Sequence, residues 1–185
     1  MAFFRRRPLG RPLRRLFPPP PVPPKLLQAN RLLASGDYPA AAEALEQLAQ
    51  GAERRGLPQA APLYLQAGHA RILAGDTPTG MGSLRRGLAL FVYTGRLQRA
   101  HRAGERIVAE LRARGLTAEA EEMATYLWSL LPAGSPAAGP EPSRRTRLPT
   151  HCPACGAPLR PDETDWLDEV TAECPYCGSP VRGTE

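Results

Sequence analysis

Apolar residues between positions 25 and 131 recur at intervals of three or four, which places them on one face of an α-helix. The clearest stretches follow the spacing i, i+3, i+7, i+10, and they are Tyr38, Ala41, Leu45 and Leu48, then Met81, Leu84, Leu88 and Phe91. One-sided stripes of this kind occur at positions 26–33, 38–48, 64–72, 81–91, 97–111 and 120–130. The pattern predicts six helices.

Glycines divide these stripes into pairs. Gly36, Gly75 and Gly115 each follow a stripe, and they are separated by 39 and 40 residues. Glycine is the residue that most often ends a helix, because it adopts a left-handed backbone without strain. Asp, Thr or Pro often follows, as expected in the first turn of the next helix. The spacing predicts an internal repeat of about three helix pairs that stack on one another to form a continuous core.

The segment GDYPAAAEALEQL, at residues 36–48, resembles the turn and second helix of a tetratricopeptide repeat. Ala29 and Gly68 are the small residues that this family places where its helices pack closely. The period of 39 to 40 residues is longer than the family's 34, the early tryptophan is absent, and Gly80 stands where the family prefers alanine. HEAT-like helix pairs, whose period is closer, remain an alternative. The resemblance implies an array of antiparallel helical hairpins.

Arginines precede the repeat glycines by three to five residues, at Arg31, Arg71 and Arg112. A basic residue at this place is favourable beside the negative end of the helix dipole, and this is the expected role. The first helices of tetratricopeptide hairpins line a concave groove. By resemblance, these three arginines would there bind an acidic peptide or a C-terminal carboxylate.

The distribution of proline limits which segments of the chain can form a packed core. Many of the 22 prolines fall before Lys25 or between residues 132 and 149, and such segments do not build a core. The chain therefore divides into a disordered basic and Pro-rich tail (1–24), a helical repeat domain (25–131), a flexible linker (132–150) and a short C-terminal unit (151–185). The linker lacks periodicity and apolar anchors, so the C-terminal unit is expected to be tethered at variable distance. Whether that unit docks on the helices is left open.

Positive charge is concentrated at the N-terminus. The net charge is +6, but residues 1–25 hold seven basic residues and no acid, so the other 160 residues hold 17 basic against 18 acidic ones. From His151 onward, two arginines face seven acids, a balance of −5. Nucleic acid or an anionic membrane is therefore a possible partner only of residues 1–25.

Membrane and export signals are not apparent in the sequence. No run of eighteen apolar residues occurs, and polyproline follows the basic N-terminus where a signal peptide would have its apolar stretch. We expect a cytoplasmic protein. In a reducing compartment, paired C-x-x-C units favour metal binding over disulfides.

Four cysteines lie in two nearly identical elements, CPACGAPLR and CPYCGSPVR. Each element places two thiolates on one tight turn that glycine permits, and two turns supply four sulfur ligands for tetrahedral zinc. Eighteen residues separate Cys155 from Cys174, within the window typical of zinc sites. The segment 151–180 resembles a zinc ribbon, a small β structure. The predicted ligands of one structural Zn²⁺ are Cys152, Cys155, Cys174 and Cys177.

Other uses of these cysteines are possible from the residues alone. Iron in a rubredoxin-like site uses the same turns, although that family separates its pairs by more residues and packs more aromatic residues around the metal. A redox dithiol would use one C-x-x-C unit beside a helix, whereas two symmetric copies indicate a shared metal. His151 is expected to be a surface histidine rather than a further ligand.

The sequence does not predict an enzyme. Four sulfur ligands close the coordination sphere, and no phosphate-binding loop, dinucleotide fingerprint, nucleophile elbow or zinc-protease helix occurs. His69 and His101 lie in predicted helices with no obvious acid or nucleophile beside them. Four thiolates with one Zn²⁺ add two negative charges to the acidic C-terminal unit, which disfavours phosphate contacts there.

The favoured hypothesis is an adaptor or scaffold that binds a protein or peptide through its helical repeats and uses the ribbon as a second module. Trp166, within the acidic strip DETDWLDEVTAE, is the candidate contact of that module. The alternative is a nucleic-acid- or membrane-associated regulatory factor that uses the basic tail. A third hypothesis is that the tail docks on the acidic ribbon of the same chain.

Overall fold

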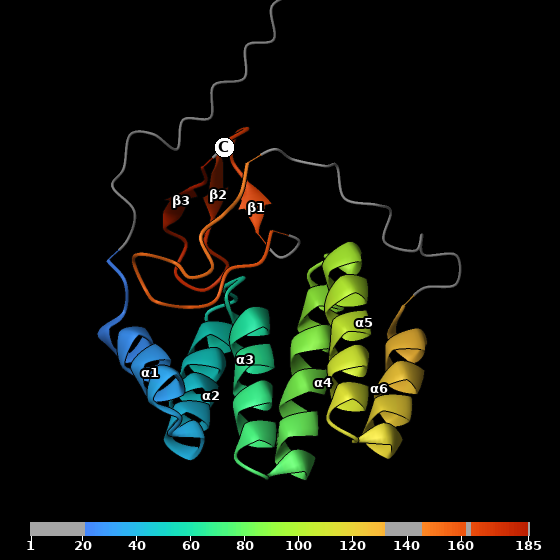
Figure 1. Cartoon of the computed structure of the whole chain (residues 1–185). Coiled ribbons are helices and arrows are strands. Elements are labelled where there is room, and N and C mark those ends of the chain that lie inside the picture. The colour runs from blue at the N-terminus through green and yellow to red at the C-terminus, as the bar shows by residue number, and fades with distance from the viewer. Residues whose placement is uncertain (1–20, 132–145, 162–163, 185) are drawn as a thin grey trace, which may run out of the picture.

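Each apolar stripe between residues 25 and 131 forms a helix in the computed structural model, which describes residues 21–131, 146–161 and 164–184. The helices are α1 (Pro24–Ser35), α2 (Tyr38–Arg54), α3 (Ala60–Leu73), α4 (Thr77–Tyr93), α5 (Leu97–Ala113) and α6 (Thr117–Leu130). They lie side by side in chain order (Figure 1). The prediction of a mainly helical chain with six helices is confirmed for the described residues. None of these helices is long and apolar enough to cross a membrane.

Glycines with a left-handed backbone end the helices. Gly36, Gly75 and Gly115 have φ values of 81°, 87° and 78°, as predicted. Gly56 and Gly95, which follow α2 and α4, adopt the same conformation with φ of 63° and 74°. Each of the first five helices is thus followed by such a glycine, which lets the chain reverse within a few residues.

Aspartates cap two of the helices that follow these turns. The Asp37 carboxylate accepts a hydrogen bond from the amide of Ala40, and Asp76 accepts one from the amide of Thr79, each at 3.3 Å. Both α2 and α4 also carry a proline in the first turn. These caps satisfy amide groups that a helix leaves unpaired at its start.

Close contact between α3 and α4 depends on glycine. A methyl group added at Gly80 would lie 2.9 Å from the carbonyl oxygen of Gly68 and 2.7 Å from a side-chain carbon of Ile72. A methyl group at Gly68 would lie 2.8 Å from the carbonyl oxygen of Gly80. The two backbones therefore cross at a distance that only glycine allows.

The C-terminal unit contains a small antiparallel sheet of β1 (Asp165–Trp166), β2 (Thr171–Glu173) and β3 (Pro180–Arg182), in the order β1-β2-β3. Val181 of β3 and Leu159 are buried at matching positions after the two cysteine turns. Arg147 pairs with Thr184, so the unit includes residues that precede His151. The predicted small β region is confirmed, whereas residues 1–20 of the tail and 132–145 of the linker lie outside the described residues.

Candidate metal centre

Two equivalent turns bring the four cysteines together. In the first turn the amide of Gly156 donates to the carbonyl of Cys152 at 2.8 Å, and in the second the amide of Gly178 donates to the carbonyl of Cys174 at 2.9 Å. Gly156 and Gly178 have φ of 75° and 74°. The left-handed glycine predicted for each C-P-x-C-G element is confirmed, and it turns both sulfurs of each pair toward one point.

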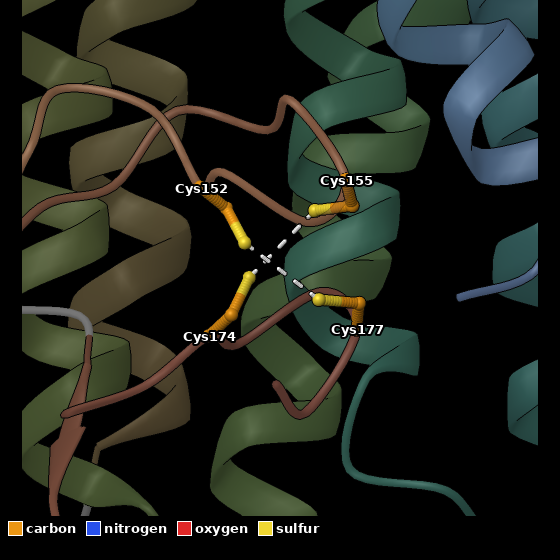
Figure 2. A group of neighbouring side chains, drawn as sticks. All are labelled: Cys152, Cys155, Cys174 and Cys177. Atoms are coloured by element: carbon orange, nitrogen blue, oxygen red, sulfur yellow. Dashed lines mark hydrogen bonds between the residues drawn. The ribbon is translucent and has the colours of Figure 1, made fainter. Parts of the chain in front are cut away.

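The sulfur positions match a tetrahedral metal site. The Sγ atoms of Cys152 and Cys177 are 3.8 Å apart, as are those of Cys155 and Cys174. All four lie within 4.8 Å of one another and point to one centre (Figure 2). An ion with metal–sulfur bonds of about 2.3 Å requires sulfurs about 3.8 Å apart, whereas a disulfide requires about 2.0 Å. The four cysteines can therefore hold one metal ion.

The cysteines share hydrogen bonds that shift their pKa values in opposite directions. A hydrogen bond with Cys174 is the main reason why the pKa of Cys155 is raised, while the pKa of Cys177 falls to about 2 because Cys155 and then Cys174 hydrogen-bond to it. Ser179 adds hydrogen bonds to Cys177 from its side chain and its amide. Four thiolates this close repel one another unless a cation lies among them, so metal binding and proton release are coupled.

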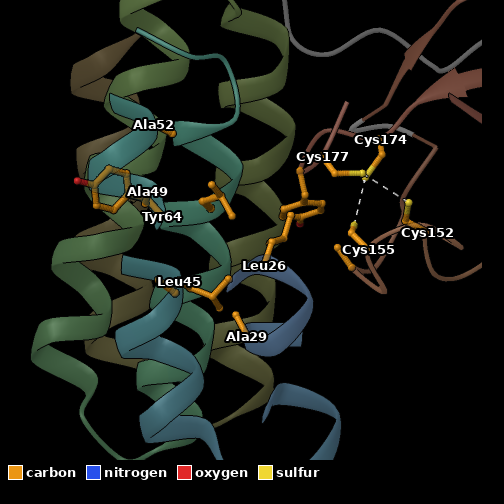
Figure 3. Packing of buried hydrophobic residues seen from close by; sticks show 14 of the residues in the cluster. Leu26, Ala29, Leu45, Ala49, Ala52, Tyr64, Cys152, Cys155, Cys174 and Cys177 are labelled. Atoms are coloured by element: carbon orange, nitrogen blue, oxygen red, sulfur yellow. Dashed lines mark hydrogen bonds between the residues drawn. The ribbon is translucent and has the colours of Figure 1, made fainter. Parts of the chain in front are cut away.

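The four-cysteine cluster lies against the helices. Asn30 of α1 donates from Nδ2 to the carbonyl oxygen of Cys155 at 2.7 Å, and its Oδ1 accepts from Nε2 of Gln66 in α3 at 3.2 Å. Arg99 of α5 forms an ion pair with Asp165 of β1. Figure 3 shows the cysteine cluster beside the helices that carry Leu26, Ala29 and Tyr64. Among these residues, Asn30 of α1 and Arg99 of α5 contact the C-terminal unit directly, and Gln66 of α3 holds Asn30.

One hydrophobic core spans both parts of the chain. It joins buried residues of the first three helices, such as Leu26 and Leu45, to the cysteines and to Val181. Leu148, within the predicted linker, packs against this core. The expectation that the C-terminal unit is tethered at variable distance is therefore corrected: the unit docks, because apolar residues on both sides share one buried cluster.

Replacing Asn30 by leucine should loosen this docking. Leucine has a similar size but leaves the Cys155 carbonyl and the Gln66 amide without their partner, and each buried polar group left unpaired costs about 1–3 kcal/mol. Denaturant unfolding should show a loss of this size, and hydrogen exchange should accelerate in residues 150–160. Arg31→Ala, at the exposed neighbouring position, is the control and should change neither. Equal stability of the two variants would contradict the contact.

A cavity of about 330 Å³ remains between the helices and the C-terminal unit. Its apolar wall includes Leu65, Phe91 and Ile107. Its polar wall is formed by Asn30, Gln66, His69, Arg106, Glu110, His151 and Arg160. Helices α1, α3, α4 and α5 and both cysteine turns thus contribute to one concave surface.

The residues predicted for partner binding do not line this cavity. Arg71 of α3 is engaged by Glu46 of α2 through two hydrogen bonds of 3.0 and 2.7 Å, which are the main reason why its pKa is raised. Arg31 and Arg112 are exposed on α1 and α5. Trp166 is half-buried in β1, and its indole N–H donates to the carbonyl of Pro161 at 3.4 Å. The structure does not bring these four residues into one site.

His69 and His101 each lie beside an acid. Glu105 is one helical turn from His101 and follows from the sequence, whereas Glu110, which lies beside His69, is on another helix and does not. His69 Nδ1 lies 3.4 Å from Glu110 of α5, and His101 Nδ1 lies 3.4 Å from Glu105. Burial lowers the pKa of His69, although Glu110 opposes the shift. Asn30, Gln66, Arg106 and Arg160 were also missed. In the sequence, Asn30 and Gln66 stand out only as polar residues in otherwise apolar segments.

Comparison with family models, with curated proteins and with solved structures gave no significant match to this chain.

Proposed function

We propose that this protein is a non-enzymatic adaptor that binds a protein or peptide partner, and that its C-terminal unit is a zinc ribbon whose metal is structural. The observation that carries this proposal is the buried, closed cluster of four cysteine sulfurs. A four-thiolate sphere has no open position for water or substrate, so its role is to hold residues 146–184 folded. Function then depends on surfaces around the metal.

Zinc is the metal best suited to this site. The ligands are four thiolates, their spacing suits bonds of about 2.3 Å, and two cysteine pairs eighteen residues apart are typical of zinc. A unit of about 40 residues also needs a stabilising metal or cross-link, because so short a chain buries too little apolar surface to fold by itself.

The helices resemble tetratricopeptide-like hairpins in their order and in their glycine contacts. In such an array the first helix of each hairpin faces the groove that receives a partner. Here α1 and α5 contact the C-terminal unit of the same chain through Asn30 and Arg99. Gln66 of α3 holds Asn30 and lines the cavity beside that unit. We therefore propose that the partner binds along the junction of the helices and the ribbon. The two parts would then form one binding surface, in place of two separately tethered modules.

Site-specific cross-linking tests this placement. A photo-cross-linking residue at Ala34, exposed at the wall of the cavity, should capture a discrete protein in the cells that produce the chain. The same residue at Ala118, exposed on α6, should not. Equal adducts from both positions, or none from Ala34, would contradict the adaptor proposal. The alternative function, nucleic-acid or membrane binding through residues 1–25, instead predicts capture that is lost on tail deletion and at high salt.

A further inference from the structure

Gln66, which lines the cavity between the helices and the ribbon, carries a buried hydrogen-bond acceptor without a partner among the described residues. Gln66 is 7 % exposed, and its Oε1 atom makes no hydrogen bond with any described residue. The other end of this amide is fixed, because its Nε2 donates to Asn30, which in turn donates to the Cys155 carbonyl. The amide therefore presents Oε1 in a set orientation, and a buried acceptor of this kind requires a donor.

Charged side chains of both signs line the cavity. Arg106 of α5 and Arg160 of the C-terminal unit contribute two positive charges, and Glu110 contributes one negative charge. Both arginines also act on His69, whose pKa is lowered mainly by burial and further by these two charges. Both arginines therefore lie near His69 at the cavity wall, where they can receive a carboxylate.

The remaining wall is apolar. Leu33, Leu65, Phe91, Ile107 and Tyr176 line it, together with small residues of α1, α3 and α5. The volume of about 330 Å³ is at the lower end of the range, about 300–1,000 Å³, in which proteins bind small molecules. The cavity thus offers room for an apolar body between the arginines and the Gln66 acceptor.

We propose that this cavity binds a small apolar monocarboxylate that carries a hydrogen-bond donor. The carboxylate lies toward Arg106 and Arg160, the donor toward Oε1 of Gln66, and the apolar part toward Leu65, Phe91 and Ile107. This binding site goes beyond the adaptor role. Because residues from the helices and from both cysteine turns form its wall, the ligand would strengthen the docking of the metal centre on the helices.

Titration of the intact protein with N-acetyl-leucine, followed by two-dimensional amide NMR, tests the proposal. We expect saturable shifts of residues around the cavity, and about tenfold weaker binding of N-acetyl-leucinamide, which lacks the carboxylate. Isocaproate, which lacks the N–H donor, should also bind more weakly. Arg160→Ala should reduce affinity about tenfold, whereas Arg182→Ala, an exposed arginine of β3 outside the cavity, should match the wild type.

Three results would overturn the proposal. No shift with any probe would mean that water alone fills the cavity, and equal effects of the two arginine variants would remove the site from the cavity wall. Tighter binding of a pentapeptide that ends in leucine would assign the cavity to a peptide C-terminus instead. These outcomes are separate from the adaptor test: a partner captured at Ala34 with no carboxylate binding would leave the adaptor and remove this ligand site.

Discussion

Removal of the metal proposed for the four cysteines is expected to unfold the C-terminal unit and to loosen α1. Metal binding to a structural four-ligand site contributes about 10–16 kcal/mol to the folding of small zinc domains, and so short a unit buries little apolar surface of its own. Because Leu26 and Ala29 share a buried core with the cysteines, and Asn30 binds the Cys155 carbonyl, the loss should extend into α1. Cys174→Ser should have the same effect as a chelator.

The second core cluster of the structure limits this effect. It contains buried residues of α3, α4, α5 and α6, such as Leu84, Ile107 and Met123, and no residue of the C-terminal unit. Hydrogen exchange should therefore accelerate in residues 146–184 and in α1 while α4, α5 and α6 stay protected. His151→Ala is the control, since this exposed side chain is not a ligand. Protection of residues 146–184 that persists without metal would refute a structural role for the site.

Two glycine-to-alanine substitutions in α4 should have opposite effects on stability. In Gly80→Ala the new methyl group meets the Gly68 backbone oxygen at 2.9 Å, which cannot move without separating α3 from α4. We expect a loss of about 1–3 kcal/mol, as for other overpacked sites. In Gly82→Ala the methyl group meets nothing within 4 Å, so the better helix propensity of alanine should add about 0.5–1 kcal/mol.

Urea unfolding of the two variants measures both effects in one helix. The helix propensity gained is the same at either position, so the difference between the variants reports the α3–α4 contact alone. If Gly80→Ala were as stable as Gly82→Ala, the two helices would not approach each other as closely as the structure has them.

Local pattern determines much of this fold. The apolar stripes predicted each helix because burial of one face is decided by residues three or four apart. The cysteine site was predicted for a similar reason, since Cys152 and Cys155, or Cys174 and Cys177, are placed by a single turn. Gly56 and Gly95 carried the same signal as Gly36, but the emphasis on a period of 39 to 40 residues concealed that a glycine ends each of the first five helices.

The docking of the C-terminal unit could not be predicted from the sequence. It depends on pairs distant along the chain, such as Asn30 with Cys155, which are 125 residues apart. Polar residues such as Asn30 and Gln66 ordinarily lie on a helix surface, and nothing local distinguishes a surface that water covers from one that another part of the chain covers. The cavity follows from that docking, so its residues could not be predicted either.

The metal content of the intact protein tests the central claim most directly. Native mass spectrometry of folded protein, purified without added metal, should show one zinc ion per chain, and Cys174→Ser should show none while His151→Ala retains it. A folded chain without metal, or one that carries iron with its visible absorption, would contradict the assignment of the four cysteines to a structural zinc ribbon.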